Sequence, residues 1–216
     1  MGKRMARVLI VGATGLVGSE LLQQLQDDPQ VTAIVAPTRQ PLPANEKTDN
    51  PVGEDLFALL SGLQQPVDII FCCLGTTRKA AGSDANFRYV DYQLVVESAL
   101  TGRRLGAQHC LVVSAVGANP RSSFLYNRTK GEMEQALREQ NWPRLTLVRP
   151  SMLLGNRPSP RLLERLTAPL FKLLPGKWRS VAAKDVAQTL LEQAFSPGSG
   201  VTVLESDQLH RYGNVH

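Results

Sequence analysis

The segment RVLIVGATGLVG, residues 7–18, sets the expected fold of this chain. Its first five residues are mostly aliphatic and β-branched, which is typical of a strand buried on both faces of a parallel sheet. Glycines follow, and leucine and valine then recur at helical spacing as far as Gln26. A strand, a glycine-rich turn and a helix in this order form the context that a phosphate-binding turn requires. We therefore predict a nucleotide site at this turn.

Each glycine of the turn has a separate expected role. Gly12 permits a sharp turn, Gly15 leaves room for a pyrophosphate to reach backbone N–H groups, and Gly18 lets the helix lie close to the strand. The helix N-terminus adds partial positive charge for the phosphates. The spacing is G-x-x-G-x-x-G rather than G-x-G-x-x-G, and a turn that serves packing alone is the alternative. The residues expected to bind the nucleotide here are Gly12, Thr14, Gly15, Leu16 and Gly18.

Strand and helix patterns alternate along the rest of the chain. We expect further strands at residues 31–35, 67–74, 110–113, 145–148 and 201–204. We expect helices at residues 16–26, 54–62, 86–102, 124–140 and 185–195, with Asp185 as a cap, and a surface loop at residues 37–51. This alternation predicts an α/β fold, a doubly wound parallel sheet covered by helices on both faces.

A single domain of residues 1–216 is expected, because the length suits one sizeable core and no long linker divides the chain. The composition changes after Pro150. Prolines there are expected to divide the sequence into short helices, and arginines and lysines make it basic. We interpret residues 151–180 as a small C-terminal lobe on this domain, with a solvated basic face as the alternative.

The composition is that of a soluble globular protein, with 43% hydrophobic and 20% charged residues. No apolar stretch reaches the length needed to span a bilayer. The net charge of +5 suits an anionic ligand, a solvated surface or a weak contact with nucleic acid. The net charge is the one feature that favours nucleic-acid binding, so we rank that function last.

The cysteines are Cys72, Cys73 and Cys110, and two of them are adjacent within an apolar run. Their odd number and their spacing fit neither a disulfide framework nor a metal site. We therefore expect buried thiols, no metal, and a reducing compartment, which we take to be the cytoplasm.

The catalytic candidates are Ser114, Tyr126 and Lys130. Tyr126 and Lys130 are four residues apart on an expected helix, so they share one face. Tyrosine normally ionises near pH ~10, but a neighbouring ammonium and a positively charged nicotinamide favour the phenolate. Ser114 ends an expected strand, where its hydroxyl can bond the same substrate oxygen as Tyr126. Tyr-x-x-x-Lys alone is a weak pattern; the upstream serine and glycine turn make it more specific for proton transfer coupled to hydride transfer.

The end of the second expected strand favours one cofactor over another. Its sequence is Ala36-Pro37-Thr38-Arg39, which lacks the acid that would bind an adenosine ribose hydroxyl. Arg39 instead offers a guanidinium fork suited to a phosphate. This favours NADP(H), with NAD(H) as the less favoured cofactor and a solvated loop arginine as the alternative interpretation.

The chain resembles a short-chain dehydrogenase/reductase of the atypical or extended kind, and more narrowly the HIV Tat-interacting protein family of oxidoreductase-like proteins. The matching runs are residues 12–18, 71–78 (FCCLGTTR), 123–126, 130–132 and 148–150. The resemblance implies a Rossmann-type fold that binds NADPH, with residues 76–82 as a loop at the mouth and residues 151–180 as a substrate-side lobe. It also implies that the cofactor is lined by Cys73, Leu74, Gly75, Lys130 and Pro150.

Asp91 departs from the wider superfamily, many members of which place an asparagine of a proton relay on the long central helix; the Tat-interacting relatives look similar to this chain there. Two functions therefore stay open. One is an NADP(H)-dependent oxidoreductase that acts on an unidentified carbonyl or alcohol through Ser114, Tyr126 and Lys130. The alternative is an NADPH-binding regulatory or redox-sensing protein with little turnover and a protein partner. The residues leave the small-molecule substrate, the reaction direction and the oligomeric state open.

Overall fold

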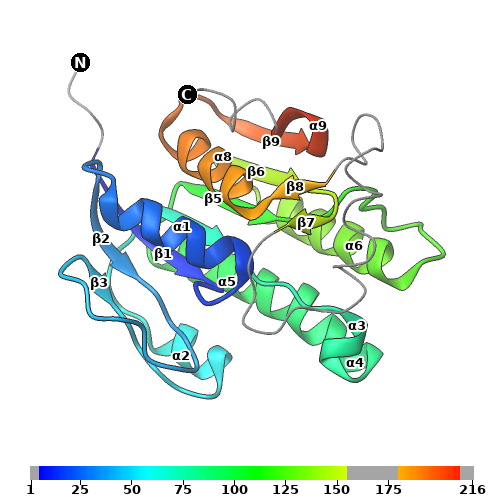
Figure 1. The fold of residues 1–216 in the computed structure, drawn as a ribbon, viewed down its shortest axis with the longest axis horizontal. Coiled ribbons are helices and arrows are strands. Elements are labelled where there is room, and N and C mark those ends of the chain that lie inside the picture. The colour runs from blue at the N-terminus through cyan, green and yellow to red at the C-terminus, as the bar shows by residue number, and fades with distance from the viewer. Residues whose placement is uncertain (1–4, 155–179, 210–216) are drawn as a thin grey trace.

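Strand β1 (Ala6–Val11) lies within a parallel sheet, between β2 (Val31–Val35) and β4 (Ile69–Cys72). The structure is a computed structural model that describes residues 5–154 and 180–209. Within these residues the sheet has seven parallel strands in the order β3-β2-β1-β4-β5-β6-β9 (Figure 1). The remaining strands of the sheet are β3 (Thr48–Asp49), β5 (His109–Val113), β6 (Arg144–Arg149) and β9 (Gly200–Glu205). The predicted doubly wound parallel fold is confirmed.

Helices cover the sheet on both faces. The longer ones are α1 (Leu16–Asp27), α2 (Leu56–Gly62), α5 (Leu94–Arg104), α6 (Leu125–Glu139) and α8 (Ala183–Phe195). Helices α1 and α8 pack side by side on one face, and α2, α5 and α6 cover the other (Figure 1). Val8 and Ile10 of β1 belong to the first core, whereas Leu9 and Val11 belong to the second. Because β1 faces helices on both sides, every one of these positions is apolar.

The short elements lie mainly around the ends of the strands. They are α3 (Arg78–Ala81), α4 (Asp84–Arg88), a π-helical turn (Tyr89–Gln93), β7 (Leu153–Leu154), β8 (Val181–Ala182) and α9 (Ser206–Leu209). Strand β7 pairs in parallel with β8, which joins the two flanks of residues 155–179. Most of the expected C-terminal lobe falls on those residues, which lie outside the described part of the chain. The single-domain organisation stays a prediction.

The structure differs from the expected elements in a few places. The loop expected at residues 37–51 contains β3, which is only two residues long and therefore shows no periodicity. The helix expected at residues 86–102 is divided by the π-helical turn, and the loop expected at 76–82 contains α3. Asp185 lies in the first turn of α8 and is not its N-cap, because β8 runs directly into the helix at Ala182.

The cysteines are unpaired, as expected. Cys72 and Cys110 are buried on β4 and β5, whereas Cys73 is half-buried at the end of β4. Burial raises the pKa of the Cys72 thiol to about 11, and it also raises the pKa values of the Cys73 and Cys110 thiols well above that of an ordinary thiol. All three therefore remain protonated at neutral pH and act as packing groups rather than nucleophiles.

The contact between α1 and the glycine turn gives a first prediction. Gly18→Ala is expected to lower the free energy of unfolding by about 1–3 kcal/mol, because its Cβ would lie 2.0 Å from the carbonyl oxygen of Gly12. Urea denaturation measures the change. Gly62→Ala is the matched control, since a Cβ there has nothing within 4 Å and should leave stability unchanged or slightly higher. Equal stabilities of Gly18→Ala and the natural protein would show that the close packing is wrong.

Candidate cofactor and catalytic site

The strand order creates a crevice between β1 and β4. From β1 the chain proceeds to β2 and β3, toward one edge of the sheet. From β4 it proceeds to β5 and β6, toward the opposite edge. The connections that leave the carboxyl ends of β1 and β4 therefore diverge, and ligands of open α/β sheets bind at such a switch point. Val11 pairs with Cys72, so Gly12 and Cys73 are the first residues beyond this edge.

The glycine turn lies against the end of β4. Gly12 has a φ of +86°, and a Cβ there would lie 2.8 Å from the carbonyl carbon of Cys73. Gly15 donates its N–H to the carbonyl oxygen of Gly12 at 3.0 Å and is the N-cap of α1. Glycine has no side chain that could cap the helix. The first backbone N–H groups of α1, at the crevice, therefore have no hydrogen bond to a cap side chain. The arrangement fits a bound pyrophosphate.

Lys130 forms a buried ion pair with Asp91 beside the residues that follow β4. Its Nζ lies 2.9 Å from Asp91 Oδ1, and the side chains are 3% and 0% exposed. Asp91 Oδ2 accepts the backbone N–H of Thr76 at 2.8 Å. A Cβ on Gly75 would lie 3.6 Å from Asp91 Oδ1 and 3.9 Å from Lys130 Nζ. The residues that follow β4 thus contact Gly12 at Cys73 and approach Lys130 at Gly75.

The charge of Lys130 depends on Asp91. Burial by itself lowers the pKa of Lys130, but the carboxylate of Asp91, together with Tyr126 and Cys72, more than offsets this effect. The pKa of Lys130 is therefore raised, and the residue is a cation throughout the neutral range. The carboxylate that keeps the ammonium charged also neutralises much of the field that this ammonium exerts on its other neighbours.

Asp91 reaches this position from the π-helical turn. The turn spans Tyr89–Gln93 and packs against α6, which carries Lys130. Asp91 is fully buried, whereas Tyr89, two residues before it, is exposed. Single π-helical turns of this kind often lie at functional sites. The sequence pattern alone predicted one continuous helix here, because the apolar positions on either side of the turn remain periodic.

Ser114 makes a contact that sequence reasoning missed. Its hydroxyl donates to Glu134 Oε1 at 2.5 Å, and both residues are buried. Glu134 is held by Arg149, whose Nε and Nη2 donate to the two carboxylate oxygens at 2.9 and 2.6 Å. Arg149 Nη1 also donates to Glu205 Oε1 at 2.8 Å. These bonds raise the pKa of Arg149, with the hydrogen bond to Glu134 as the largest cause.

Tyr126, Lys130 and Glu134 recur every four residues along α6, so they lie on one face of the helix. The ring of Tyr126 lies 5.7 Å from that of Phe87, centroid to centroid, and the residue is 37% exposed. Glu134 continues the Tyr-x-x-x-Lys spacing by one more helical turn. That continuation was the signal that would have drawn attention to Glu134 in the sequence.

Three arginines differ in their contacts. Arg149 is engaged by two carboxylates, and Arg78 pairs with Asp84 at 2.7 Å on the surface. Arg39 is exposed beyond the end of β2.

Pro150 follows β6, and its carbonyl oxygen accepts the backbone N–H of Val116 at 2.9 Å. This hydrogen bond joins Pro150 to the segment after Ser114.

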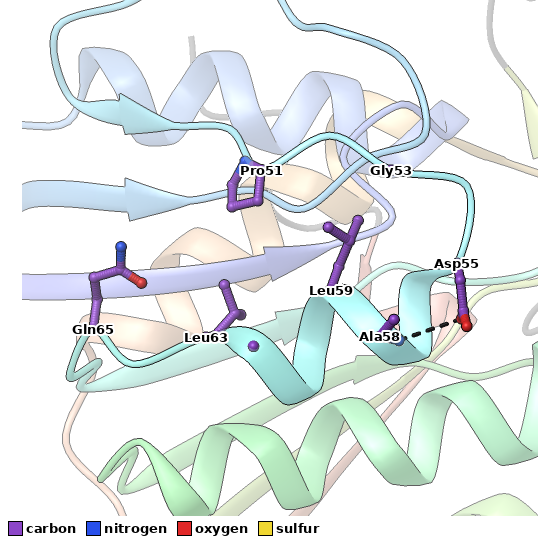
Figure 2. A pocket seen from close by; sticks show the side chains of 8 residues that line it. Pro51, Gly53, Asp55, Ala58, Leu59, Leu63 and Gln65 are labelled. Atoms are coloured by element: carbon purple, nitrogen blue, oxygen red, sulfur yellow. Dashed lines mark hydrogen bonds between the residues drawn. The ribbon is translucent and has the colours of Figure 1, made fainter.

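A pocket of about 440 Å³ lies away from this crevice, between α2 and the backbone of residues 51–53 (Figure 2). It is lined by Pro51, Gly53, Asp55, Ala58, Leu59, Gly62, Leu63 and Gln65. Asp55 Oδ1 accepts the N–H groups of Phe57 and Ala58, so this carboxylate caps α2. The lining includes none of the expected site residues.

Residues 5–154 and 180–209 contain neither a candidate metal site nor a candidate membrane span. No cluster of three or more histidine, cysteine, aspartate or glutamate side chains there has a geometry suited to a metal ion. None of the helices in this part of the chain combines the length and the apolar character that a membrane span needs.

A glycine turn at the switch point of a parallel sheet defines a nucleotide-binding protein of the Rossmann type. The sequence profile of a protein family described as NAD(P)H-binding matches residues 12–197. The chain therefore belongs to this NAD(P)H-binding family.

Individual relatives match nearly the whole length of the chain. The rat protein HTATIP2 is 35% identical over 215 residues, which cover 95% of this chain and 88% of the rat protein. The Candida albicans protein FMP52, described as mitochondrial, is 30% identical over 222 residues, which cover 95% of this chain and 97% of the fungal protein. The resemblance to the Tat-interacting protein family is confirmed by the rat relative.

Solved structures share the fold at low sequence identity. MoeE5 in complex with UDP-glucuronic acid and NAD superposes with a TM-score of 0.72 and 17% identity, covering 92% of this chain and 75% of that protein. The Bordetella bronchiseptica enzyme WbmF in complex with NAD⁺ gives a TM-score of 0.68 and 17% identity, covering 99% and 80%. Both likenesses concern the fold alone.

The predicted cytoplasmic location is wrong. Fungal relatives from Scheffersomyces stipitis, Candida albicans, Lodderomyces elongisporus and Aspergillus fumigatus are all named as mitochondrial proteins. The prediction rested on unpaired cysteines, which indicate that the fold needs no disulfide framework. Because this property does not distinguish one compartment without disulfides from another, the cysteines could not support the inference.

The buried ion pair gives a second prediction. Asp91→Asn keeps an acceptor for Thr76 but leaves Lys130 without its counter-ion, so it should lower the free energy of unfolding by about 3 kcal/mol near neutral pH. In the natural protein the raised pKa of Lys130 gives stability that is lost only as pH rises through that value. In the variant, burial dominates and lowers the Lys130 pKa, so the deficit should shrink as the pH approaches about 10.

Chemical denaturation at several pH values measures this deficit. Asp84→Asn is the matched control, because it breaks the exposed pair with Arg78 and should cost less than about 1 kcal/mol at any pH. A deficit for Asp91→Asn that is the same at pH 7 and near pH 10 would contradict the electrostatic explanation.

The carboxylate of Glu134, which accepts the hydrogen bond of the Ser114 hydroxyl, gives a third prediction. Glu134→Ala should cost about 3 kcal/mol of stability, because it removes the buried partner of Arg149 and of the Ser114 hydroxyl. Glu205→Ala removes the more exposed partner of the same arginine and should cost less than about 1 kcal/mol. Thermal unfolding of the two variants compares these losses, and equal losses would show that Glu134 has no special structural role.

Proposed function

We propose that this protein is an NADP(H)-dependent oxidoreductase of the short-chain dehydrogenase/reductase type, which interconverts a carbonyl compound and an alcohol. One observation carries the proposal: the glycine turn and Lys130 approach the same short segment after β4. Cys73 contacts Gly12, and Gly75 lies beside the Lys130–Asp91 pair. A cofactor that follows this segment from its phosphates to its nicotinamide would reach the face of α6 that carries Tyr126.

The cofactor is held in this proposal by residues from several strand ends. The residues of the glycine turn that bind the pyrophosphate are Gly12, Thr14, Gly15, Leu16 and Gly18. Arg39 binds the 2′-phosphate of the adenosine ribose, which favours NADP(H) over NAD(H). Cys73, Leu74 and Gly75 line the middle of the cofactor, and Lys130 and Pro150 lie at its nicotinamide half. When bound, the cofactor supplies or accepts the hydride.

Tyr126 transfers the proton in this proposal. During reduction its hydroxyl donates a proton to the carbonyl oxygen, and during oxidation the phenolate accepts the proton of the alcohol. Lys130 keeps a positive charge near the phenol. The hydroxyl hydrogen of Ser114 is directed at Glu134, so Ser114 Oγ offers lone pairs to a neighbouring O–H group. Ser114 thus orients the hydroxyl of the alcohol or of Tyr126.

A second candidate function is a regulatory or redox-sensing protein that binds NADPH with little turnover. Two contacts favour it. The charge of Lys130 is balanced by Asp91, and the hydrogen of Ser114 is engaged by Glu134, so both groups already have strong partners within the protein. Such a protein would gain or lose a protein partner on binding NADPH without passing hydride to a carbonyl.

The catalytic proposal predicts the effect of Tyr126→Phe. This variant should lower turnover at least about 100-fold, because it removes the proton donor, while NADPH binding stays within about twofold of the natural protein. Phenylalanine retains the ring that packs on Phe87, so the change isolates the hydroxyl. Oxidation of NADPH with a panel of aldehydes and ketones measures turnover, and fluorescence titration measures binding.

The same measurements separate the two functions. Turnover on a good substrate that survives Tyr126→Phe would overturn the proton-transfer role. A natural protein that binds NADPH tightly, reduces no carbonyl in the panel and changes its protein partner with NADPH would favour the regulatory function instead. Partner binding that ignores NADPH would count against that second function.

A further inference from the structure

The segment that carries Arg39 forms no helix or named strand, although Thr38 makes an isolated β-bridge with Val52. Residues 36–42 leave β2 and contain prolines at positions 37 and 41, which cannot donate backbone hydrogen bonds. Arg39 is exposed in the middle of this segment. An arginine on an unsupported loop would bind a phosphate weakly, because ordering the loop would oppose binding. The shape of the segment must therefore come from contacts with another part of the chain.

The side chain of Asn50 makes those contacts on both sides of Arg39. Its Nδ2 donates to the carbonyl oxygen of Ala36 at 2.6 Å and to Thr38 Oγ1 at 2.8 Å. Its Oδ1 accepts the backbone N–H of Leu42 at 2.8 Å. One amide group thus joins residues before and after Arg39, and it is anchored immediately after β3.

The orientation of the Asn50 amide is fixed by these partners. Leu42 presents an N–H group, which requires an oxygen, and Ala36 presents a carbonyl oxygen, which requires an N–H. A carboxylate at position 50 would face the carbonyl oxygen of Ala36 with another acceptor, and it would add negative charge near Arg39. Among side chains of this size, only asparagine supplies two donors and an acceptor on one planar group.

Thr38 completes the support from within the segment. Its hydroxyl accepts from Asn50 and donates to the carbonyl oxygen of Gln40 at 2.6 Å, so the backbone on both sides of Arg39 is bonded. Its backbone N–H donates to the carbonyl oxygen of Pro51, and its carbonyl oxygen accepts the N–H of Gly53, each at 3.0 Å. Thr38 is buried, whereas Arg39 beside it is exposed.

We propose that Asn50 is a positioning residue for cofactor specificity: it holds residues 36–42 in the shape that presents Arg39 to the 2′-phosphate of NADP(H). This inference rests on the proposed function, in which Arg39 recognises that phosphate. Asn50 acts through the backbone of the segment. It therefore supports the recognition of NADPH, which carries the phosphate, more than that of NADH, which lacks it.

Fluorescence titrations with NADPH and NADH test this role. Arg39→Ala should weaken NADPH binding about tenfold or more and leave NADH binding nearly unchanged, because a charge-assisted bond to the phosphate is lost. Asn50→Ala should weaken NADPH binding about tenfold and NADH binding by less than about twofold. In the double variant the loss for NADPH should match that of Arg39→Ala alone, because the shape of the segment no longer matters once the guanidinium is absent.

Two further variants complete the experiment. Asn45→Ala is the control, because the Asn45 side chain bonds Lys47 and Thr48 in the same connection and makes no bond to residues 36–42; both affinities should stay unchanged. Thr38→Val removes the hydroxyl that joins Asn50 to Gln40, so it should lower NADPH affinity selectively. This variant keeps the test available if Asn50→Ala does not fold.

The outcomes separate this proposal from the function on which it rests. If Arg39→Ala is not selective for NADPH, the proposed preference for NADP(H) is overturned. If Arg39→Ala is selective but Asn50→Ala and Thr38→Val weaken NADPH and NADH equally, only the role of Asn50 is overturned, and the residue is a general support of the fold. Additive losses in the double variant would also overturn it, because Asn50 would then act independently of Arg39.

Discussion

The close approach of three backbone segments beyond β1 is the constraint on which this structure depends. The carbonyl of Gly12 lies where a side chain of Gly18 would be, and the α-carbon of Gly12 lies against the backbone of Cys73. These contacts fix α1 over the end of β1 and fix the end of β4 beside it. Glycine at these positions lets the backbone segments approach this closely, and the direction of α1 places partial positive charge at the end of the crevice.

Helix α6 carries two buried charged residues, and each is paired with an opposite charge from another element. Lys130 faces an aspartate from the π-helical turn, and Glu134 faces an arginine from β6. Buried ions of this kind contribute little net stability, but each is costly to leave unpaired, so the elements that carry them must dock in one relative position. The two pairs therefore hold α6 in register with its neighbours, which sets where Ser114 and Tyr126 lie relative to the cofactor crevice.

Much of the fold followed from the sequence, because apolar periodicity and glycine spacing are local signals. Strand β2 was predicted at its observed bounds, and the glycine turn was predicted with its neighbouring strand and helix. The pairing of Ser114 with Glu134 could not be predicted in this way, since it joins residues from different elements through side chains that are both common on surfaces. The π-helical turn was missed because it changes the phase of a helix without interrupting its apolar pattern.

That turn links the chemistry of the site to the length of a helix. A π-helical turn accommodates one residue more than an α-helical turn, so removing a single residue from Tyr89–Gln93 would restore a continuous α-helix. The residues before the deletion would then rotate by about 100° around the helix axis relative to those after it. If the deleted residue follows Asp91, Asp91 would rotate with the residues before the deletion and would no longer face Lys130, although neither residue had been substituted. Insertions and deletions in this helix, as much as substitutions, are therefore a route by which related chains can change the charge of the site.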